Sequence, residues 1–220
     1  MVRTIVRKDM RRTLAVALLL AGMAGTAPAA HAADPADSMD PRLICAELTE
    51  TAERLMRLPR MLLHAVSLAE SGRWNAKAQA NTAWPWTVYA EGRGRYYPTR
   101  EAAMAEIEAL RARGVKNIDV GCMQVNLMYH GGNFDSVAQA LDPVHNVAYA
   151  ARHLKNLRVT RRSWSAAVTH YHSGTPEHGR PYWRRVFALW NEERRRDFRA
   201  RREARINAAQ ATRIAHRIDR

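Results

Sequence analysis

Apolar residues recur along most of the chain at the spacing of one helical face. The pattern predicts helices over residues 41–57, 60–71, 100–113, 142–158, 163–171 and 182–190. Thr99, Asp142 and Ser163 are suited to cap three of these helices at their start. Gly114 is suited to close the helix over 100–113. In the helix over 41–57, the apolar positions expected to face the core are Leu43, Ile44, Leu48, Leu55 and Met56.

A different pattern occupies the middle of the chain, where β-favouring residues form short runs. Residues 86–90 and 95–97 flank Glu91-Gly92-Arg93-Gly94 and predict a hairpin whose loop is longer than two residues. Residues 117–121 predict a third short strand that enters a tight turn, and residues 123–129 a short helix. The whole pattern predicts an α+β fold that is predominantly α-helical, with a small β-element.

The helix over 60–71 has an apolar face and ends by presenting one carboxylate. Its apolar positions are Leu62, Leu63, Val66 and Ala69. Glu70 lies in the last turn, and Gly72 is placed to end the helix in a left-handed cap. The helix C-terminus and the apolar setting both disfavour the ionised carboxylate and raise its pKa. Such a carboxyl can serve as a general acid; the alternative is a surface glutamate paired with Arg73.

The N-terminus has the composition of a signal peptide. Five basic residues precede an apolar stretch over 14–25, and Ala30-His31-Ala32 fits a small-x-small cleavage site. We therefore expect residues 1–32 to be removed and the mature protein to be periplasmic or otherwise exported. The apolar stretch is too short to span a bilayer as a mature helix, so we do not expect a transmembrane protein.

The charge balance is strongly basic. The formal net charge is +14, and removal of residues 1–32 takes away five basic residues and one acidic residue, leaving +10. A basic exported protein suits an anionic wall polymer or membrane surface rather than nucleic acid. From Glu192 onward ten arginines stand against five acidic residues. We expect a domain over 33–190 and a basic helical tail over 191–220, which either grips an anionic polymer or only solubilises the protein.

The chain has two cysteines, Cys45 and Cys122. In an oxidising compartment this even count permits one disulfide, which would stabilise the fold by a few kcal/mol. The alternative is that both are small buried core residues. No Cys/His cluster has the spacing of a zinc site, and we expect neither a metal nor a cofactor.

Four separated motifs resemble those of the SLT-type lytic transglycosylases. Residues 69–72 (Ala-Glu-Ser-Gly) resemble the family's Glu-Ser motif, and residues 121–126 (Gly-Cys-Met-Gln-Val-Asn) resemble Gly-Leu-Met-Gln-Val. Residues 146–154 are similar to the helix Asn-x-x-x-Gly/Ala-x-x-Tyr/His-Leu, and residues 166–174 to Ala-Val-x-x-Tyr-Asn-x-Gly. The resemblance covers residues 41–190, with Cys122 in place of an apolar residue and His172 in place of asparagine.

The resemblance implies a lysozyme-like domain that cleaves the β-1,4 bond between N-acetylmuramic acid and N-acetylglucosamine in peptidoglycan glycan strands. The muramic acid C6 hydroxyl completes the reaction in place of water and leaves a 1,6-anhydro end. Ordinary glycosidases need two carboxylates. Here the substrate's N-acetyl group would stabilise the reacting centre, so Glu70 alone would act first as acid and then as base.

The resemblance also implies supporting roles around Glu70. The residues expected to bind the glycan are Ser71, Met123, Gln124, Asn126 and Tyr171. Tyr171 would place its hydroxyl near Glu70. For Met123 the alternative is packing in the core, and for Tyr171 simple burial of the ring.

Several alternatives stay open. Residues 84–116 exceed the minimal family pattern, and their aromatic side chains either stack on sugars or cover the core: Trp84, Trp86, Tyr89 and Tyr96. If Glu91 or Asp119 faces Glu70 across a gap suited to water, a hydrolytic muramidase is the better interpretation. A further alternative is a non-enzymatic wall-binding or secretion-assembly protein. We expect a monomer, and analogy with small family members links it to a secretion or flagellar assembly.

Overall fold

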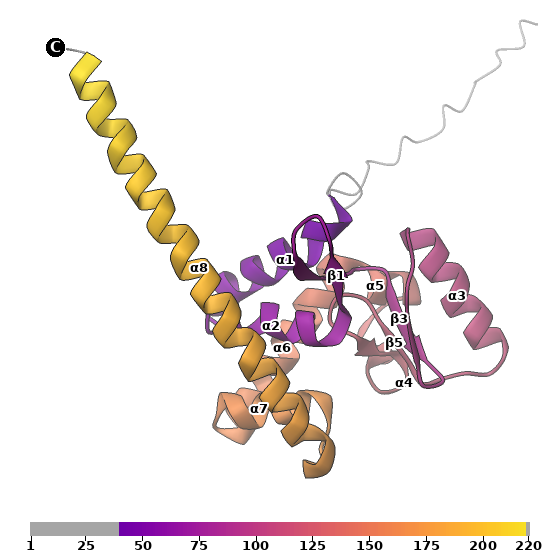
Figure 1. The fold of residues 1–220 in the computed structure, drawn as a ribbon. Coiled ribbons are helices and arrows are strands. Elements are labelled where there is room, and N and C mark those ends of the chain that lie inside the picture. Colours follow the sequence, from indigo (N-terminus) through magenta and orange to yellow (C-terminus); the bar gives the residue numbers. More distant parts are fainter. Residues whose placement is uncertain (1–39, 219–220) are drawn as a thin grey trace, which may run out of the picture. The chain divides into compact units, whose positions relative to one another are not determined.

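The computed structural model describes residues 40–218, and residues 34–220 form one compact unit. The predicted signal peptide lies outside the described residues. The helices are α1 (Pro41–Met56), α2 (Leu62–Ser71), α3 (Arg100–Ala112), α4 (Leu127–His130), α5 (Val137–Leu141), α6 (Pro143–Arg161), α7 (Trp164–His172) and α8 (Pro176–Ile218), with a 3₁₀ turn at Gly131–Asn133 (Figure 1). None of the helices over residues 40–218 has the length and apolar character needed to cross a membrane.

The strands form two small antiparallel sheets. They are β1 (Gly72–Asn75), β2 (Ala80–Ala83), β3 (Thr87–Ala90), β4 (Arg93–Tyr96), β5 (Ile118–Val120) and β6 (Val125–Asn126). Strands β1 and β2 pair as a hairpin, and the other four make a sheet in the order β4-β3-β5-β6. A mostly helical α+β fold with a small β-element is therefore confirmed.

Helix α1 begins and ends close to its predicted limits, but its buried face differs from the prediction. Leu43 and Leu55 are 50% and 78% exposed, so their expected burial is wrong. The buried face instead includes Cys45, Thr49 and Ala52. These residues are small, which lets α1 pack closely against α2 and α6.

The hairpin of β3 and β4 corrects the predicted loop length. Ala90 pairs directly with Arg93, so the turn contains only Glu91 and Gly92. Their φ angles of 51° and 76° are both left-handed, as a two-residue type I′ turn requires. The sequence signal was weak because a glutamate, rather than asparagine or glycine, occupies the first turn position.

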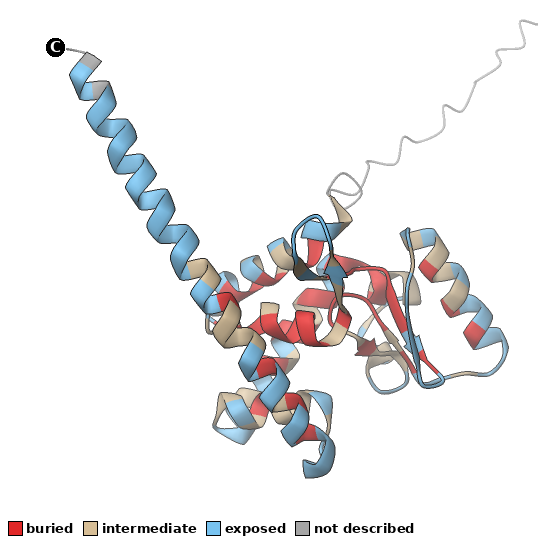
Figure 2. Ribbon diagram, viewed as in Figure 1, coloured by how far each residue is buried: buried red, intermediate tan, exposed pale blue. Residues whose placement is uncertain are grey.

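Two apolar cores support the fold, and the buried residues in Figure 2 mark them. One core gathers residues of α1, α2, α6, α7 and α8, and the other lies between the four-stranded sheet and helices α3 and α5. Helix α2 is buried on most of its surface, with Glu70 and His64 only partly covered. The carboxylate of Glu70 therefore emerges from a helix that is otherwise core.

Helix α8 is much longer than the predicted helix over 182–190. It continues without interruption from Pro176 to Ile218. Its first part packs against α2 and α7, where Tyr182 and Val186 are buried. Residues 198–214 are all exposed, as the pale blue part of α8 in Figure 2 shows.

Candidate active site

Glu70 lies in the last turn of α2, immediately before strand β1. Gly72 has φ −67° and ψ 131°, so the left-handed cap expected there is wrong. The chain passes directly from the helix into an extended strand. A Cβ atom at Gly72 would lie 2.2 Å from the Leu68 carbonyl oxygen. Glycine is needed here for this close passage of the backbone, and not for its left-handed conformation.

The carboxyl group of Glu70 is held by a tyrosine from α8. The Tyr182 hydroxyl donates a hydrogen bond of 2.6 Å to Glu70 Oε1. Burial raises the pKa of Glu70 to about 7, and nearby Asp119 adds to this rise, whereas Tyr182 and Arg185 oppose it. A carboxyl with this pKa can both give and take a proton near neutrality.

The direct hydrogen bond to Glu70 comes from Tyr182, which the sequence did not single out, and Tyr171 lies close enough for the charge of Glu70 to raise its pKa. The Tyr171 hydroxyl donates instead to the Met123 carbonyl oxygen, at 2.9 Å. Both phenols have raised pKa values, chiefly from burial and then from the charge of Glu70. The His172 ring stacks on Tyr182, with centroids 4.4 Å apart. The helical spacing of Tyr182 and Val186 was the available signal, since it places both on one face of the last helix.

The turn over residues 121–124 lies against the end of α2. Gly121 has φ 82°, and a Cβ atom there would lie 2.6–2.8 Å from the side-chain atoms of Asn146. The fully buried Asn146 accepts a bond of 3.0 Å from the Met123 N–H. It also donates bonds to the carbonyl oxygens of Val120 and Ala140, at 3.0 and 2.9 Å. Asn146, which begins the motif over residues 146–154, therefore fixes the turn in the motif over residues 121–126.

Ser71 and Met123 are both fully buried. The Ser71 hydroxyl lies 2.8 Å from the Cys122 carbonyl oxygen and 3.2 Å from that of Ser67, and it donates to these acceptors. The Met123 side chain packs in the first apolar core. Side chains this deeply buried do not fit the direct glycan contacts that were expected of them. For Met123 the alternative, packing in the core, describes the structure. Both residues position the turn behind Glu70.

Gln124 and Asn126 are partly exposed, and their predicted contact with the glycan stays a prediction. Gln124 Nε2 donates to the carbonyl oxygens of Thr87 and Gly121, at 3.1 and 3.0 Å. Asn126 caps α4 through its side-chain oxygen. Its amide nitrogen donates a bond of 2.6 Å to Asp119 Oδ1. Asn126 thus holds the orientation of a second carboxylate.

A disulfide joins Cys45 in α1 to Cys122 in the turn, with an S–S distance of 2.08 Å. This confirms the predicted pairing over the alternative of two buried thiols. The bond ties the turn to the helical core on one side, while Ser71 ties it to α2 on the other. The backbone beside Glu70 is therefore anchored from two directions.

Of the two further carboxylates considered, Asp119 lies near Glu70. It is paired with Tyr89 on β3 and Asn126 on β6, which puts these three side chains on the same face of the sheet. Burial raises the pKa of Asp119, and the Asn126 bond opposes this. Glu91 lies at the exposed hairpin turn, where it pairs with Arg113 at 3.1 Å.

The aromatic residues of the insertion divide into two groups. Trp84 and Trp86 are 7% and 5% exposed, and they belong to the second core. Tyr89 and Tyr96 are 42% and 44% exposed. The tryptophans therefore cover the core, while both tyrosines remain open to a ligand.

A line of aromatic rings leads away from Tyr171 and was not predicted. The His153 ring lies 5.8 Å from that of Tyr171 and is stacked with Tyr149 at 6.1 Å. The Tyr149 hydroxyl lies 2.9 Å from His130 Nδ1. Burial lowers the pKa of His130 and of His153, so both imidazoles stay neutral at pH 7.

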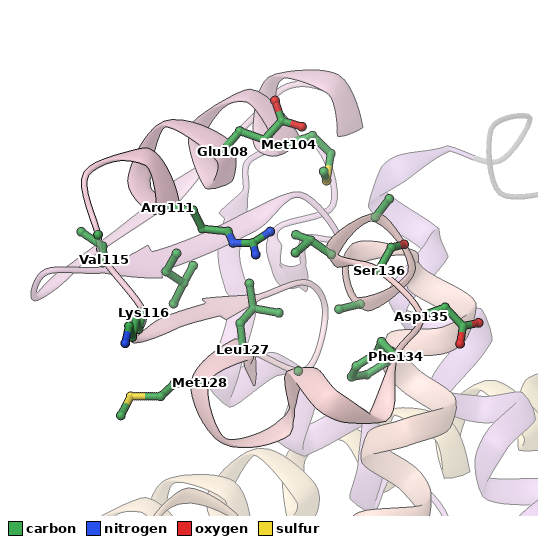
Figure 3. A pocket seen from close by; sticks show the side chains of 16 residues that line it. Met104, Glu108, Arg111, Val115, Lys116, Leu127, Met128, Phe134, Asp135 and Ser136 are labelled. Carbon is green, nitrogen blue, oxygen red and sulfur yellow. The ribbon is translucent and has the colours of Figure 1, made fainter.

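A cavity of about 920 Å³ lies apart from the site of Glu70. It lies between α3, α4 and α5, and Arg111 reaches into it from α3 (Figure 3). Ile118 lines this cavity, whereas its strand neighbour Asp119 points to the opposite face of the sheet. Over residues 40–218, no group of three or more His, Cys, Asp or Glu side chains is arranged to hold a metal ion.

A buried helix that ends in a carboxyl of raised pKa, next to a small antiparallel sheet, fits the lysozyme-like domain that the four motifs imply. The family profile of the Transglycosylase SLT domain matches residues 47–185, and the chain belongs to this family. Membership implies cleavage of peptidoglycan glycan strands. No curated protein and no solved structure matches the chain.

Proposed function

We propose that the protein is an exported lytic transglycosylase that cleaves the β-1,4 bond between N-acetylmuramic acid and N-acetylglucosamine. The observation that carries this proposal is the Glu70 carboxyl, with a pKa of about 7 and a fixed hydrogen bond from Tyr182. Export is supported by the sequence of residues 1–32 and by the Cys45–Cys122 disulfide, since disulfides persist in oxidising compartments.

Glu70 begins the reaction in its protonated form. Because Oε1 accepts from Tyr182, Oε2 is the oxygen available to the substrate. It gives its proton to the leaving glycosidic oxygen as the bond to C1 of the muramic acid breaks. The substrate's N-acetyl group stabilises the positive charge that develops at C1.

The second step returns a proton to Glu70. The carboxylate takes it from the C6 hydroxyl of the muramic acid, whose oxygen then bonds to C1 and closes the 1,6-anhydro ring. A pKa near neutrality suits both steps, because a sufficient fraction of Glu70 is protonated to act as the acid and its carboxylate is basic enough to accept the second proton. The Tyr182 hydroxyl donates to the carboxylate between the steps and stabilises its charge.

Hydrolysis is a second candidate, and Asp119 favours it. This carboxyl lies on the open face of the sheet and is close enough to Glu70 to raise its pKa. Most glycosidases use two carboxyl groups that flank the glycosidic bond. In that reaction Asp119 would activate a water molecule or stabilise C1, and the product would carry a reducing end.

Mass spectrometry of the products released from purified sacculi tests the proposal. We expect anhydromuropeptides, each lighter by one water than the hydrolytic product. Glu70→Gln should abolish product release while the melting temperature shows that the domain stays folded. Reducing-end products that disappear in Asp119→Asn would establish hydrolysis instead. Product release that survives Glu70→Gln would overturn the role of Glu70 in both reactions. A wild-type protein that releases no product and only binds sacculi would be a wall-binding protein.

A further inference from the structure

The second half of α8 carries a high density of positive charge, most of which forms no ion pair among residues 40–218. Between residues 198 and 217 six arginines stand against one acidic residue, Glu203. The arginines are Arg199, Arg201, Arg202, Arg205, Arg213 and Arg217. All of them are exposed. Exposed charge of one sign is a candidate for contact with a partner of the opposite sign.

The charge is gathered on one side of the helix. At the helical turn of 100° per residue, six arginines fall within a sector of about 120°. They are Arg195, Arg199, Arg202, Arg205, Arg213 and Arg217, and we call this sector the arginine face. It is ~33 Å long at the helical rise per residue. The opposite side carries small residues, among them Ala200, Ala204 and Ala211.

Arg196 and Arg201 of α8 form ion pairs, whereas none is found for the arginine face among residues 40–218. Asp197 binds Arg60 and Arg201, at 2.8 and 3.0 Å. Within residues 40–218, no ion pair is found for Arg202, Arg205 or any later arginine of α8. Like charges three and four positions apart repel one another on a helix. An anionic surface would relieve that repulsion along the whole face.

Two large apolar side chains lie among these arginines. Phe198 and Ile206 fall within the same sector, and they are 63% and 45% exposed. A polysaccharide can stack a sugar ring on Phe198, but it offers little apolar surface to Ile206. The headgroup region of a bilayer would cover both side chains while its phosphates meet the arginines. The mixture of charged and apolar groups therefore favours a lipid surface over a wall polymer.

We propose that the arginine face binds the surface of an anionic phospholipid bilayer, with α8 lying along the headgroups. Phe198 and Ile206 enter the interface only shallowly, because the other apolar residues over 198–214 are alanines and Ile214, and Ile214 lies outside the arginine face. The attraction is electrostatic and weakens as salt screens it. This binding does not depend on the chemistry of Glu70, so it stands or falls separately from the proposed function.

Cosedimentation with vesicles tests the proposal on residues 34–220, which form a compact unit without the apolar N-terminal stretch. We expect binding to equimolar phosphatidylglycerol and phosphatidylcholine, little binding to phosphatidylcholine alone, and loss of binding in high salt. The variant Arg205→Gln/Arg213→Gln/Arg217→Gln should weaken binding at least about tenfold. The matched control Arg57→Gln/Arg93→Gln/Arg161→Gln removes the same charge from exposed positions on the domain and should change binding less than about twofold.

The double variant Phe198→Ser/Ile206→Ser separates a lipid surface from a polyanion. It should weaken vesicle binding severalfold and leave binding to purified sacculi unchanged. An arginine-face variant that loses binding to sacculi but keeps binding to vesicles would overturn the proposal in favour of a wall polymer. Equal losses in the arginine-face variant and the domain control would also overturn it, since net charge alone would then explain binding.

Discussion

At the scale of single residues, the pKa of Glu70 is a balance between burial and the bond from Tyr182. Burial favours the protonated acid, and the phenol donates to the carboxylate and so favours the ionised form. The balance leaves the pKa at about 7. A tyrosine from the last helix thus adjusts the proton affinity of a residue that lies more than a hundred positions earlier.

Replacing Tyr182 with phenylalanine removes the hydrogen bond that lowers the pKa of Glu70 and leaves the effect of burial. The pKa of Glu70 should therefore rise further in Tyr182→Phe. Because the first step needs protonated Glu70, kcat/KM of the wild type should fall above pH 7, and this alkaline limb should move to higher pH in the variant. The measurement is a pH profile on soluble glycan fragments. Tyr171→Phe is the control, since its hydroxyl bonds to a carbonyl oxygen, and its alkaline limb should stay in place. A shift to lower pH in Tyr182→Phe would contradict this account.

The same raised pKa predicts how stability depends on pH. A carboxyl whose pKa rises from 4.5 in the unfolded chain to about 7 in the fold binds more protons when folded. Its favourable contribution is complete below pH 4.5 and is lost as the pH rises through 7. Glu70→Gln, which stays neutral, should match the wild type in melting temperature at pH 4 and exceed it at pH 8. A difference that is constant with pH would show that Glu70 is not buried in this way.

Local sequence patterns revealed Glu70 but not the atoms around it. A carboxylate at the end of an apolar helix is visible in ten residues. The burial of Ser71 and Met123 depends on how the turn over 121–124 packs against α2 and α6, and no local pattern encodes that. The bond from Tyr182 to Glu70 joins residues 112 positions apart, and no local pattern encodes it either.

At the scale of elements, the turn over residues 121–124 links helices α1, α2 and α6 beside Glu70. It receives the disulfide, the Ser71 hydroxyl and the Asn146 amide. Two glycines of nearly equal φ allow its packing to be separated from its backbone conformation. Gly121 has φ 82° and contacts Asn146, whereas Gly114 has φ 83° and open space beside it.

Gly114→Ala should therefore cost only the strain of a left-handed alanine, about 1 kcal/mol. Gly121→Ala adds a clash with the fully buried Asn146, so it should cost about 3 kcal/mol or more and lower kcat as the turn shifts. Denaturant unfolding of the two variants gives the difference directly. Equal losses of stability would show that Asn146 adapts and does not fix the turn.

The elements that sequence predicted well carry their own end signals. Thr99, Asp142 and Ser163 all cap helices as expected, because each cap is a contact within three residues. The hairpin of β1 and β2 was missed because residues 72–83 consist largely of alanine, asparagine and glycine, which are depleted in strands. Helix α5 is one turn long and has too few residues for a periodic signal.

At the scale of the whole molecule, the first part of α8 packs against the domain and the later part is exposed. The first part completes the core around Glu70, and Trp190 donates a bond of 2.7 Å to the Arg60 carbonyl oxygen. Beyond Arg201 the helix contributes no buried residue among those described. Composition indicated a basic tail from Glu192 onward. In the structure α8 continues from the domain into this tail without a break, so no change of secondary structure marks where the tail begins.

Truncation separates these two parts. A chain that ends at Arg201 keeps the ion pairs of Asp197, and the described side chains that it removes are all exposed, so its free energy of unfolding should change by less than about 0.5 kcal/mol. Its kcat on soluble glycan fragments should equal that of the full chain. A chain that ends at Pro181 loses the buried Tyr182 and Val186, together with the bond to Glu70. It should lose several kcal/mol of stability and all activity. Thermal unfolding and fragment cleavage measure both effects. If the longer truncation product were already inactive on soluble fragments, the exposed half of α8 would belong to the catalytic domain, and its arginines would act on the glycan itself.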